Sequence, residues 1–129
     1  MAQIKIYGDA EFLSQTRSLI SDVIHSCVVD ALAFPPEKRA HRFILLQPED
    51  FIYFSTRTRQ HIVIEISLFE GRTIETKKKL IYLLFDRLST QALIDPIDIE
   101  ITITETPKHN WGIRGKTGDE LELSYNVEV

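Results

Sequence analysis

The sequence predicts an α/β (α+β) fold, in which two β-α-β repeats form a four-stranded sheet with two helices on one face. Two observations predict it. A strand pattern, a helix pattern and a second strand pattern follow one another in residues 2–54, and the same order returns in residues 61–107. The segment HRFILLQPED of the first half also resembles DIEITITETP of the second, each a strand that ends beside a proline. A unit of roughly 60 residues therefore indicates an internal duplication within a single domain.

The first repeat begins almost at the first residue. Apolar and polar residues alternate over residues 3–7, which predicts a short strand. Apolar residues then recur at helical spacing from Phe12 to Leu32, and Pro35-Pro36 ends this predicted helix. A second strand is expected over residues 41–47, with a brief extension at residues 51–54.

The second repeat follows the same plan. Alternation over residues 62–67 predicts a strand, and Gly71 then breaks the period of two. Thr73 is a suitable N-cap for a helix that extends to about Thr90, because apolar residues recur there at helical spacing. After a stop at Asp95-Pro96, residues 97–104 are expected to form the last strand of the repeat.

One face of such a sheet has no helical cover. The apolar residues that we expect to need cover on that face are Ile4, Ile6, Phe43, Leu45, Val63 and Ile101. Self-association is the expected way of burying them. In the C-terminal extension, residues 108–129, apolar and polar residues alternate from Leu121 to Val127, which predicts a final strand that pairs with the edge of a neighbouring subunit.

Composition limits the classes of partner. A chain of 129 residues with 43% apolar and 26% charged residues is globular rather than disordered. Its net charge of −4 gives no overall field that favours nucleic acid or acidic lipid. Because no segment approaches membrane-spanning length and Cys27 is the single cysteine, we expect a cytoplasmic protein with no membrane partner. Cys27 is expected to be a small buried hydrophobe.

The sequence shows no signature of a metal or cofactor site. The four histidines have no ligand partners at useful spacing, and no phosphate loop, Ser-His-Asp arrangement or paired-carboxylate signature occurs. Arg72 is different, since it lies where a predicted strand ends and a predicted helix begins. There its guanidinium and the first free N–H groups of the helix can face one small carboxylate. The alternative is a solvated surface cation.

Three features together resemble the tautomerase superfamily. They are the duplicated β-α-β unit that starts at the first residues, the segment EGRT-x-E-x-K at the second helix, and a late NWGIRG. The resemblance covers nearly the whole chain and is to double-length members, similar to macrophage migration inhibitory factor and malonate semialdehyde decarboxylase. It implies a homotrimer with active sites between neighbouring subunits. It also implies a cofactor-independent isomerase whose substrate is a small carboxylate.

In that family the catalyst is an amino-terminal proline, exposed when the initiator methionine is removed. Its amine carries a proton between the carbon and oxygen ends of an enol or 2-keto acid. This chain has Ala2 at that position. A free Ala2 amine can act as a general base or form a Schiff base, whereas retention of Met1 excludes both routes.

The other site residues follow from the same resemblance. Arg72 matches the family's substrate-carboxylate arginine. Glu70 replaces a second arginine of the decarboxylase-like members, and Lys38 replaces their water-activating acid. Hydration or decarboxylation of an acrylate-like substrate is therefore not expected. A basic loop instead suits a more anionic ligand, such as a dicarboxylate.

Four further residues are candidates for the same pocket. Trp111 and Ile113 match positions at which the family lines its pocket with apolar groups, and Arg114 follows them. Arg42 joins Lys38 as a candidate substrate cation. The alternatives are that both cations are solvated or paired with acids, and that Trp111 is a packing anchor at a subunit contact.

Three functions remain open from the sequence. The first is keto-enol isomerisation of a small 2-keto or enol carboxylate by proton transfer. The second is a binding or regulatory protein on the same scaffold, which has lost catalysis because Ala2 replaces the proline. The third is a purely structural assembly without a small-molecule site.

Overall fold

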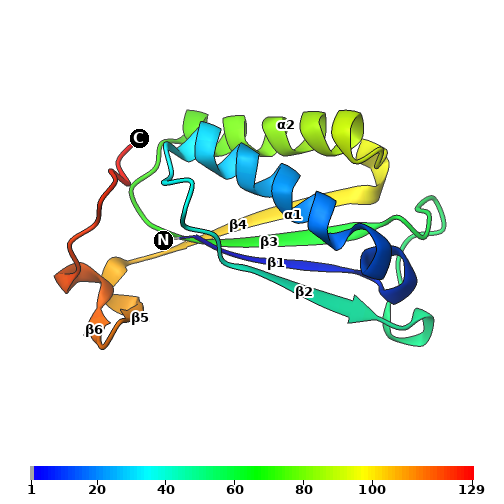
Figure 1. Cartoon of the computed structure of the whole chain (residues 1–129), viewed down its shortest axis with the longest axis horizontal. Coiled ribbons are helices and arrows are strands. Elements are labelled where there is room, and N and C mark those ends of the chain that lie inside the picture. Colours follow the sequence, from blue (N-terminus) through cyan, green and yellow to red (C-terminus); the bar gives the residue numbers. More distant parts are fainter. Residues whose placement is uncertain (1) are drawn as a thin grey trace.

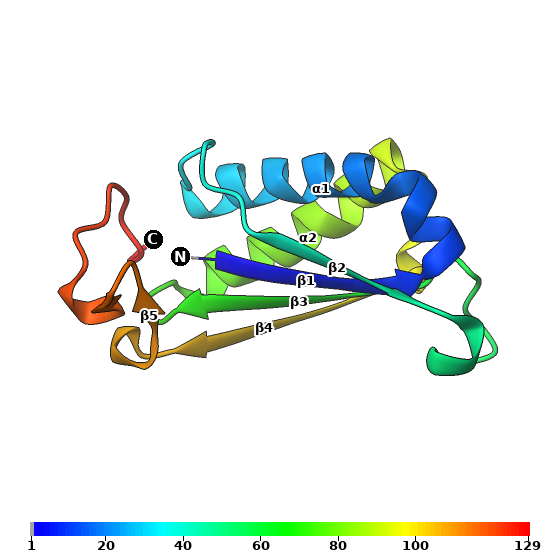
Figure 2. The ribbon, with the colours of Figure 1, turned by 60° about the horizontal axis from the view of Figure 1, so that its bottom comes forward.

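The computed structural model describes residues 2–129 (Figure 1). Its main elements are β1 (Ala2–Asp9), α1 (Ala10–Leu32), β2 (His41–Leu46), β3 (Ile62–Phe69), α2 (Ile74–Gln91) and β4 (Ile99–Thr106). The strands form one sheet in the order β2-β1-β3-β4. The pairs β1–β2 and β3–β4 are parallel, and the central pair β1–β3 is antiparallel. Both helices lie on the same side of the sheet (Figures 1 and 2). The predicted fold of two β-α-β repeats is confirmed.

Both helices begin at the polar side chains that the sequence places there. The Asp9 carboxylate accepts a hydrogen bond from the Phe12 N–H at 3.0 Å. The Thr73 hydroxyl accepts one from the Thr76 N–H at 3.2 Å, so the predicted N-cap is confirmed. Each cap satisfies a backbone donor that has no partner within its own helix.

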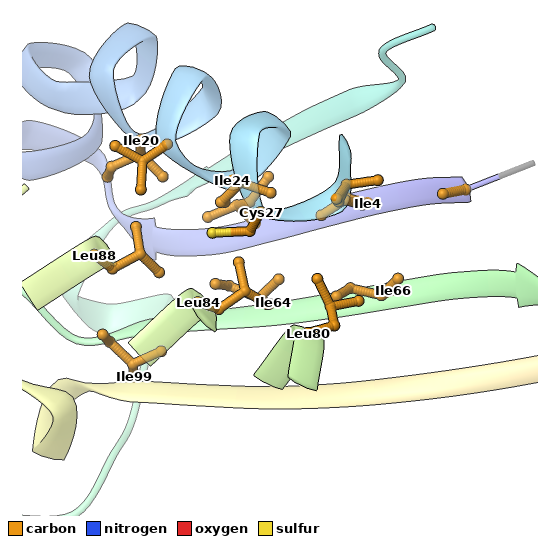
Figure 3. Close-up of a cluster of buried hydrophobic side chains, with 14 of the residues drawn as sticks. Ile4, Ile20, Ile24, Cys27, Ile64, Ile66, Leu80, Leu84, Leu88 and Ile99 are labelled. Carbon is orange, nitrogen blue, oxygen red and sulfur yellow. The ribbon is translucent and has the colours of Figure 1, made fainter. Parts of the chain in front are cut away.

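The core lies between the helices and the covered face of the sheet (Figure 3). The central strands contribute Ile4 and Ile64, and α2 contributes Leu84, all with no more than 1% of their surface exposed. Cys27 on α1 is fully buried in the same cluster, as expected for a small hydrophobe. Burial raises the pKa of its thiol to about 11, so the thiol stays protonated and inert.

The prediction of which apolar residues lie on the uncovered face is largely wrong. Ile4 and Ile6 are buried in the core under the helices, and Phe43, Leu45 and Ile101 pack against that same core. The register explains this, because Phe43 lies opposite Ile6, and Ile101 lies opposite the buried Ile64. Only Val63 of the expected set lies on the other face.

The uncovered face instead carries many polar residues. Lys5, Tyr7 and Glu65 alternate with the buried residues of the two central strands, and Tyr7 Oη donates to Glu65 Oε1 at 2.7 Å. Since successive side chains point to opposite faces, the helices cover the isoleucine-rich face and leave this mixed face open. Only part of its area is therefore apolar.

The C-terminal extension contains a two-stranded hairpin of β5 (Gly112–Ile113) and β6 (Lys116–Thr117). Short 3₁₀ turns are found at Pro48–Asp50, Pro96–Asp98, Lys108–Asn110 and Gly118–Glu120. The predicted strand extension at residues 51–54 is wrong, because this segment is not paired with any strand of residues 2–129. Residues 121–127 are likewise not paired within one chain, and their pairing with the edge of a neighbouring subunit stays a prediction. No helix of residues 2–129 is long and apolar enough to cross a bilayer.

Candidate active site

Two of the candidate site residues, Ala2 and Arg72, lie at the same end of the sheet. There β1 begins, β3 ends and α2 begins, and the C-terminal end of the chain lies close by (Figures 1 and 2). Ala2 is paired with Leu68 across β1 and β3. Arg72 follows shortly after the end of β3 at Phe69. The antiparallel register thus brings Ala2 and Arg72, far apart in the sequence, to the same end of the fold.

Ala2 lies at the wall of a hollow of about 290 Å³. The other lining residues come from the loop that follows α1 and are Phe34, Glu37, Lys38, Arg39 and Ala40. Ala2 is 5% exposed, so the start of β1 is largely shielded from solvent. The structure therefore places Ala2 and Lys38 at one hollow. Whether Met1 is retained lies outside the described residues.

Arg72 is a buried cation with unused hydrogen-bonding capacity. The residue is 5% exposed, and its Nη1 donates to the Phe69 carbonyl at 3.3 Å. Its Nε and Nη2 are buried without a hydrogen-bond partner among residues 2–129. These two atoms share one edge of the planar guanidinium, which is the fork that a carboxylate fills with two parallel hydrogen bonds. An unfilled buried edge of this kind is costly to folding.

Burial opposes the charge of Arg72, and its polar neighbours partly offset this effect. Burial lowers its pKa, whereas the neighbouring Tyr125 and Glu105 raise it. Glu105 Oε1 accepts from Lys77 Nζ at 2.6 Å, and Glu105 Oε2 is buried without a partner among residues 2–129. With two cations and one carboxylate, the group of Arg72, Lys77 and Glu105 has a surplus of positive charge.

Tyr125 belongs to the site although the sequence did not indicate it. Its ring meets that of Phe34 edge-on at 4.8 Å between centroids, and Lys38 Nζ lies 5.7 Å from its ring centre. Its hydroxyl interacts with Arg72 by hydrogen bonding and charge. Tyr125 thus joins the hollow at Ala2 to the guanidinium of Arg72. No local pattern around residue 125 distinguishes it from a core-facing strand residue.

Trp111 reaches the same region through Phe69. Its Nε1 donates to Thr106 Oγ1 at 2.7 Å, and its ring is perpendicular to that of Phe69 at 5.0 Å. Phe69 also supplies the carbonyl that holds Arg72. Within one chain, Trp111 therefore packs behind the strand end that carries Arg72.

The remaining candidates are spread more widely. Ile113 is half-buried in β5, and Arg114 is exposed in the turn before β6, where its positive charge acts to lower the pKa of Tyr125. Arg42 is exposed on the uncovered face of the sheet, and it donates to Gln3 Oε1 at 3.0 Å. Within one chain Arg42 is therefore separated by the sheet from the face that carries Ala2. The part of the chain described here holds no group of three His, Cys, Asp or Glu residues arranged for a metal ion.

Comparisons with known proteins agree with this architecture. The sequence model of a family described as tautomerase enzyme matches residues 38–114. An FG41 malonate semialdehyde decarboxylase, solved after inhibition by 3-bromopropiolate, is 27% identical with a TM-score of 0.76, over 85% of this chain and 87% of that one.

Two further solved structures show the fold at lower identity. A fused 4-OT, described as an asymmetric trimer, is 22% identical with a TM-score of 0.80, over 91% of this chain and 96% of that one. N1, a member of the cis-3-chloroacrylic acid dehalogenase family, is 18% identical with a TM-score of 0.77, over 89% of this chain and 82% of that one. The family match spans more than half of the sequence and the fold agrees over most of it, so the chain belongs to the tautomerase family.

Proposed function

We propose that this protein binds a small 2-keto or enol carboxylate and moves a proton between its carbon and oxygen ends. One observation carries the proposal. Arg72 is 5% exposed, and its Nε and Nη2 have no hydrogen-bond partner among residues 2–129. A carboxylate with two oxygens in one plane satisfies both donors at once.

The charge around Arg72 favours an anion of this kind. Lys38 Nζ lies over the ring of Tyr125 and the charge of Arg114 acts on the same residue, so two further cations act close to Arg72. Arg72 also comes directly before the N-cap of α2, where the helix dipole is positive. The nearby cations and the helix dipole would both stabilise a bound carboxylate, and Lys38 would stabilise a second carboxylate on the ligand.

The proposed proton carrier is the amine of Ala2 in a chain from which Met1 has been removed. Ala2 lines the same hollow as Lys38 and Arg39, two cations that outnumber the single carboxylate there, Glu37. Burial and nearby cations lower the pKa of an α-amine from its usual value of about 7.7–8.0. The neutral amine that results at neutral pH is the form that accepts a proton.

We also propose that the site is completed by self-association as a trimer. The fused 4-OT with the same fold is described as a trimer. Arg42 lies across the sheet from Ala2 within one chain. In an assembly Arg42 would act on the ligand of a neighbouring subunit.

A second candidate is a protein that binds the carboxylate without turning it over. Two observations favour it, namely the alanine at the position of the family's proline and the cation Lys38 in the hollow at Ala2. Ala2 lacks the cyclic secondary amine of the family's proline, and a protonated Lys38 cannot accept a proton. Binding at Arg72 would be the same for both candidates.

Ketonisation of an aromatic enol pyruvate tests the proposal. We expect turnover by the native chain, with kcat/KM lower by roughly 10- to 100-fold in Arg72→Lys, which keeps the charge but loses the fork. Arg17→Lys is the matched control, since Arg17 is exposed on α1. Measurable turnover at equal rates in the native chain and Arg72→Lys would refute the site.

Binding measurements separate the two candidates. If the native chain binds pyruvate but does not ketonise the enol, and Arg72→Lys weakens that binding by a similar factor, the second candidate is supported. If pyruvate binds equally well to the native chain and to Arg72→Lys, both candidates are refuted. Thermal unfolding of each variant checks that the buried substitution leaves the fold intact.

A further inference from the structure

The segment that follows Tyr125 packs against the residues on either side of Arg72. Val127, two residues later, is 4% exposed, and its carbonyl packs so closely on Gly71 that an added Cβ there would lie 3.2 Å away. The Thr73 N–H donates to a main-chain oxygen of Val129 at 3.0 Å. The segment that carries Tyr125 is therefore anchored on the residues that flank Arg72.

The ring of Tyr125 is positioned as well as its backbone. Phe34 contacts it edge-on at 4.8 Å, and Lys38 Nζ lies 5.7 Å from its centre. Both of these residues also line the hollow at Ala2. Tyr125 thus stands between the buried edge of Arg72 and the position of the proposed proton carrier.

The direction of the hydroxyl proton follows from the chemistry of its neighbour. The Tyr125 hydroxyl interacts with the Arg72 guanidinium. A guanidinium has donors and no acceptor, so the phenol oxygen is the acceptor in that interaction and its own O–H is directed elsewhere. Burial raises the pKa of Tyr125, which keeps the hydroxyl protonated and able to donate at neutral pH.

We propose that Tyr125 recognises the oxygen bonded to the carbon next to the bound carboxylate. Its hydroxyl donates a hydrogen bond to this keto or enol oxygen. The inference rests on the proposed carboxylate site at Arg72. Nε and Nη2 of Arg72 have no hydrogen-bond partner among residues 2–129, so a carboxylate bound to them would lie close to the hydroxyl that interacts with the same guanidinium. The hydroxyl then donates to the ligand, and the site selects 2-keto and enol acids over simple carboxylates.

A pair of matched ligands tests this selectivity. Pyruvate and propionate have the same carbon chain, and only pyruvate has an oxygen beside the carboxylate. Calorimetric titration of the native protein is expected to give a Kd for pyruvate about three- to tenfold lower than that for propionate, the effect of one hydrogen bond. In Tyr125→Phe the two Kd values are expected to become equal, mainly because pyruvate binds more weakly.

Two controls, Tyr82→Phe and Arg72→Lys, make the result of Tyr125→Phe interpretable. Tyr82→Phe changes a tyrosine that is 72% exposed on α2 and should keep the native ratio of Kd values. Tyr125→Phe keeps the ring contacts with Phe34 and Lys38. If Tyr125 served only to pack against these residues, the variant would keep the native ratio of Kd values, and this result would overturn the inference. Arg72→Lys should weaken both ligands. If Arg72→Lys binds both ligands as well as the native protein does, the carboxylate site itself is refuted. If Arg72→Lys binds both ligands more weakly but Tyr125→Phe keeps the native ratio of Kd values, only the role of Tyr125 is refuted.

Discussion

Ala2 lies directly opposite Leu68 in the antiparallel pairing of β1 with β3, and β3 leads at once to Arg72. The register of two central strands therefore decides that the start of the chain and the buried guanidinium share one end of the sheet. A shift of one residue would turn the side chain of Ala2 to the other face. The proposed proton carrier and the proposed anion site are thus joined by backbone pairing.

A proline at position 2 should raise kcat. In Ala2→Pro from which Met1 has been removed, we expect kcat for ketonisation to rise about tenfold or more, because a secondary amine replaces a primary one at the same position. Proline is tolerated at the first residue of a strand, so the sheet should persist. Steady-state kinetics measures the change, and intact mass verifies the processing.

Arg72→Lys in the Ala2→Pro background is the control for that gain. It should remove most of the new activity, since the gain depends on a bound carboxylate. A fully processed Ala2→Pro protein with native kcat would contradict the assignment of the amine.

His41 should make stability depend on pH. Its Nδ1 lies 2.7 Å from Ser21 Oγ, and Arg39 and His25 lie close by. Burial, and then the charges of Arg39 and His25, lower the pKa of His41 from 6.5 to about 4, against a small opposing effect of Asp22. The folded protein therefore keeps His41 neutral at pH values at which the unfolded chain takes up a proton.

The free energy of unfolding should consequently fall as the pH drops from 6.5 to about 4. We expect His41 to account for about 1–2 kcal/mol of this loss, after allowance for solvent screening of a partly buried ring. His41→Asn, whose amide can still meet Ser21, should lose less over the same range. Urea unfolding at both ends of the range measures this, and an equal loss in the two proteins would contradict the prediction.

Leu84→Ala should destabilise the fold strongly. Leu84 is fully buried between α2 and the sheet, so its removal leaves a cavity that costs about 2–5 kcal/mol (Figure 3). Leu19→Ala on α1 is the control, because Leu19 is 47% exposed and its loss should cost less than about 1 kcal/mol. Chemical denaturation compares the two, and similar costs would mean that the core is packed differently.

The purified protein should be a trimer. Light scattering is expected to return three times the chain mass, as for the fused 4-OT that is described as a trimer. Association would also bury exposed apolar side chains such as Ile52, which is 92% exposed, and Phe54, which is 66% exposed. A monomer mass would remove the proposed role of Arg42 at a neighbouring subunit.

The repeats could be predicted from the sequence because their signals are local. Alternation marks the strand at 62–67, recurrence at helical spacing marks the helix after Thr73, and the side chain of Thr73 caps that helix itself. Arg72 could be singled out for the same reason, since the strand-to-helix junction is visible along the chain. Each of these features depends on residues that are neighbours in the sequence.

The faces of the sheet and the site around Tyr125 were decided by tertiary structure. Alternation shows that a strand has two faces, but only the register with Ile64 and Ile66 shows that the helices cover Ile4 and Ile6. Residues 121–127 alternate like a strand, yet within one chain no strand of residues 2–129 pairs with them.

The amino-acid sequence by itself therefore determined the repeats, their caps and the position of Arg72. Tertiary structure decided what surrounds that arginine, because Phe34, Arg72 and Tyr125 come from three separate segments and share no local pattern. Their meeting depends on the antiparallel pairing of β1 with β3 and on the return of the C-terminal segment to Thr73. Long-range contacts of this kind leave no periodic signal in the residues that make them.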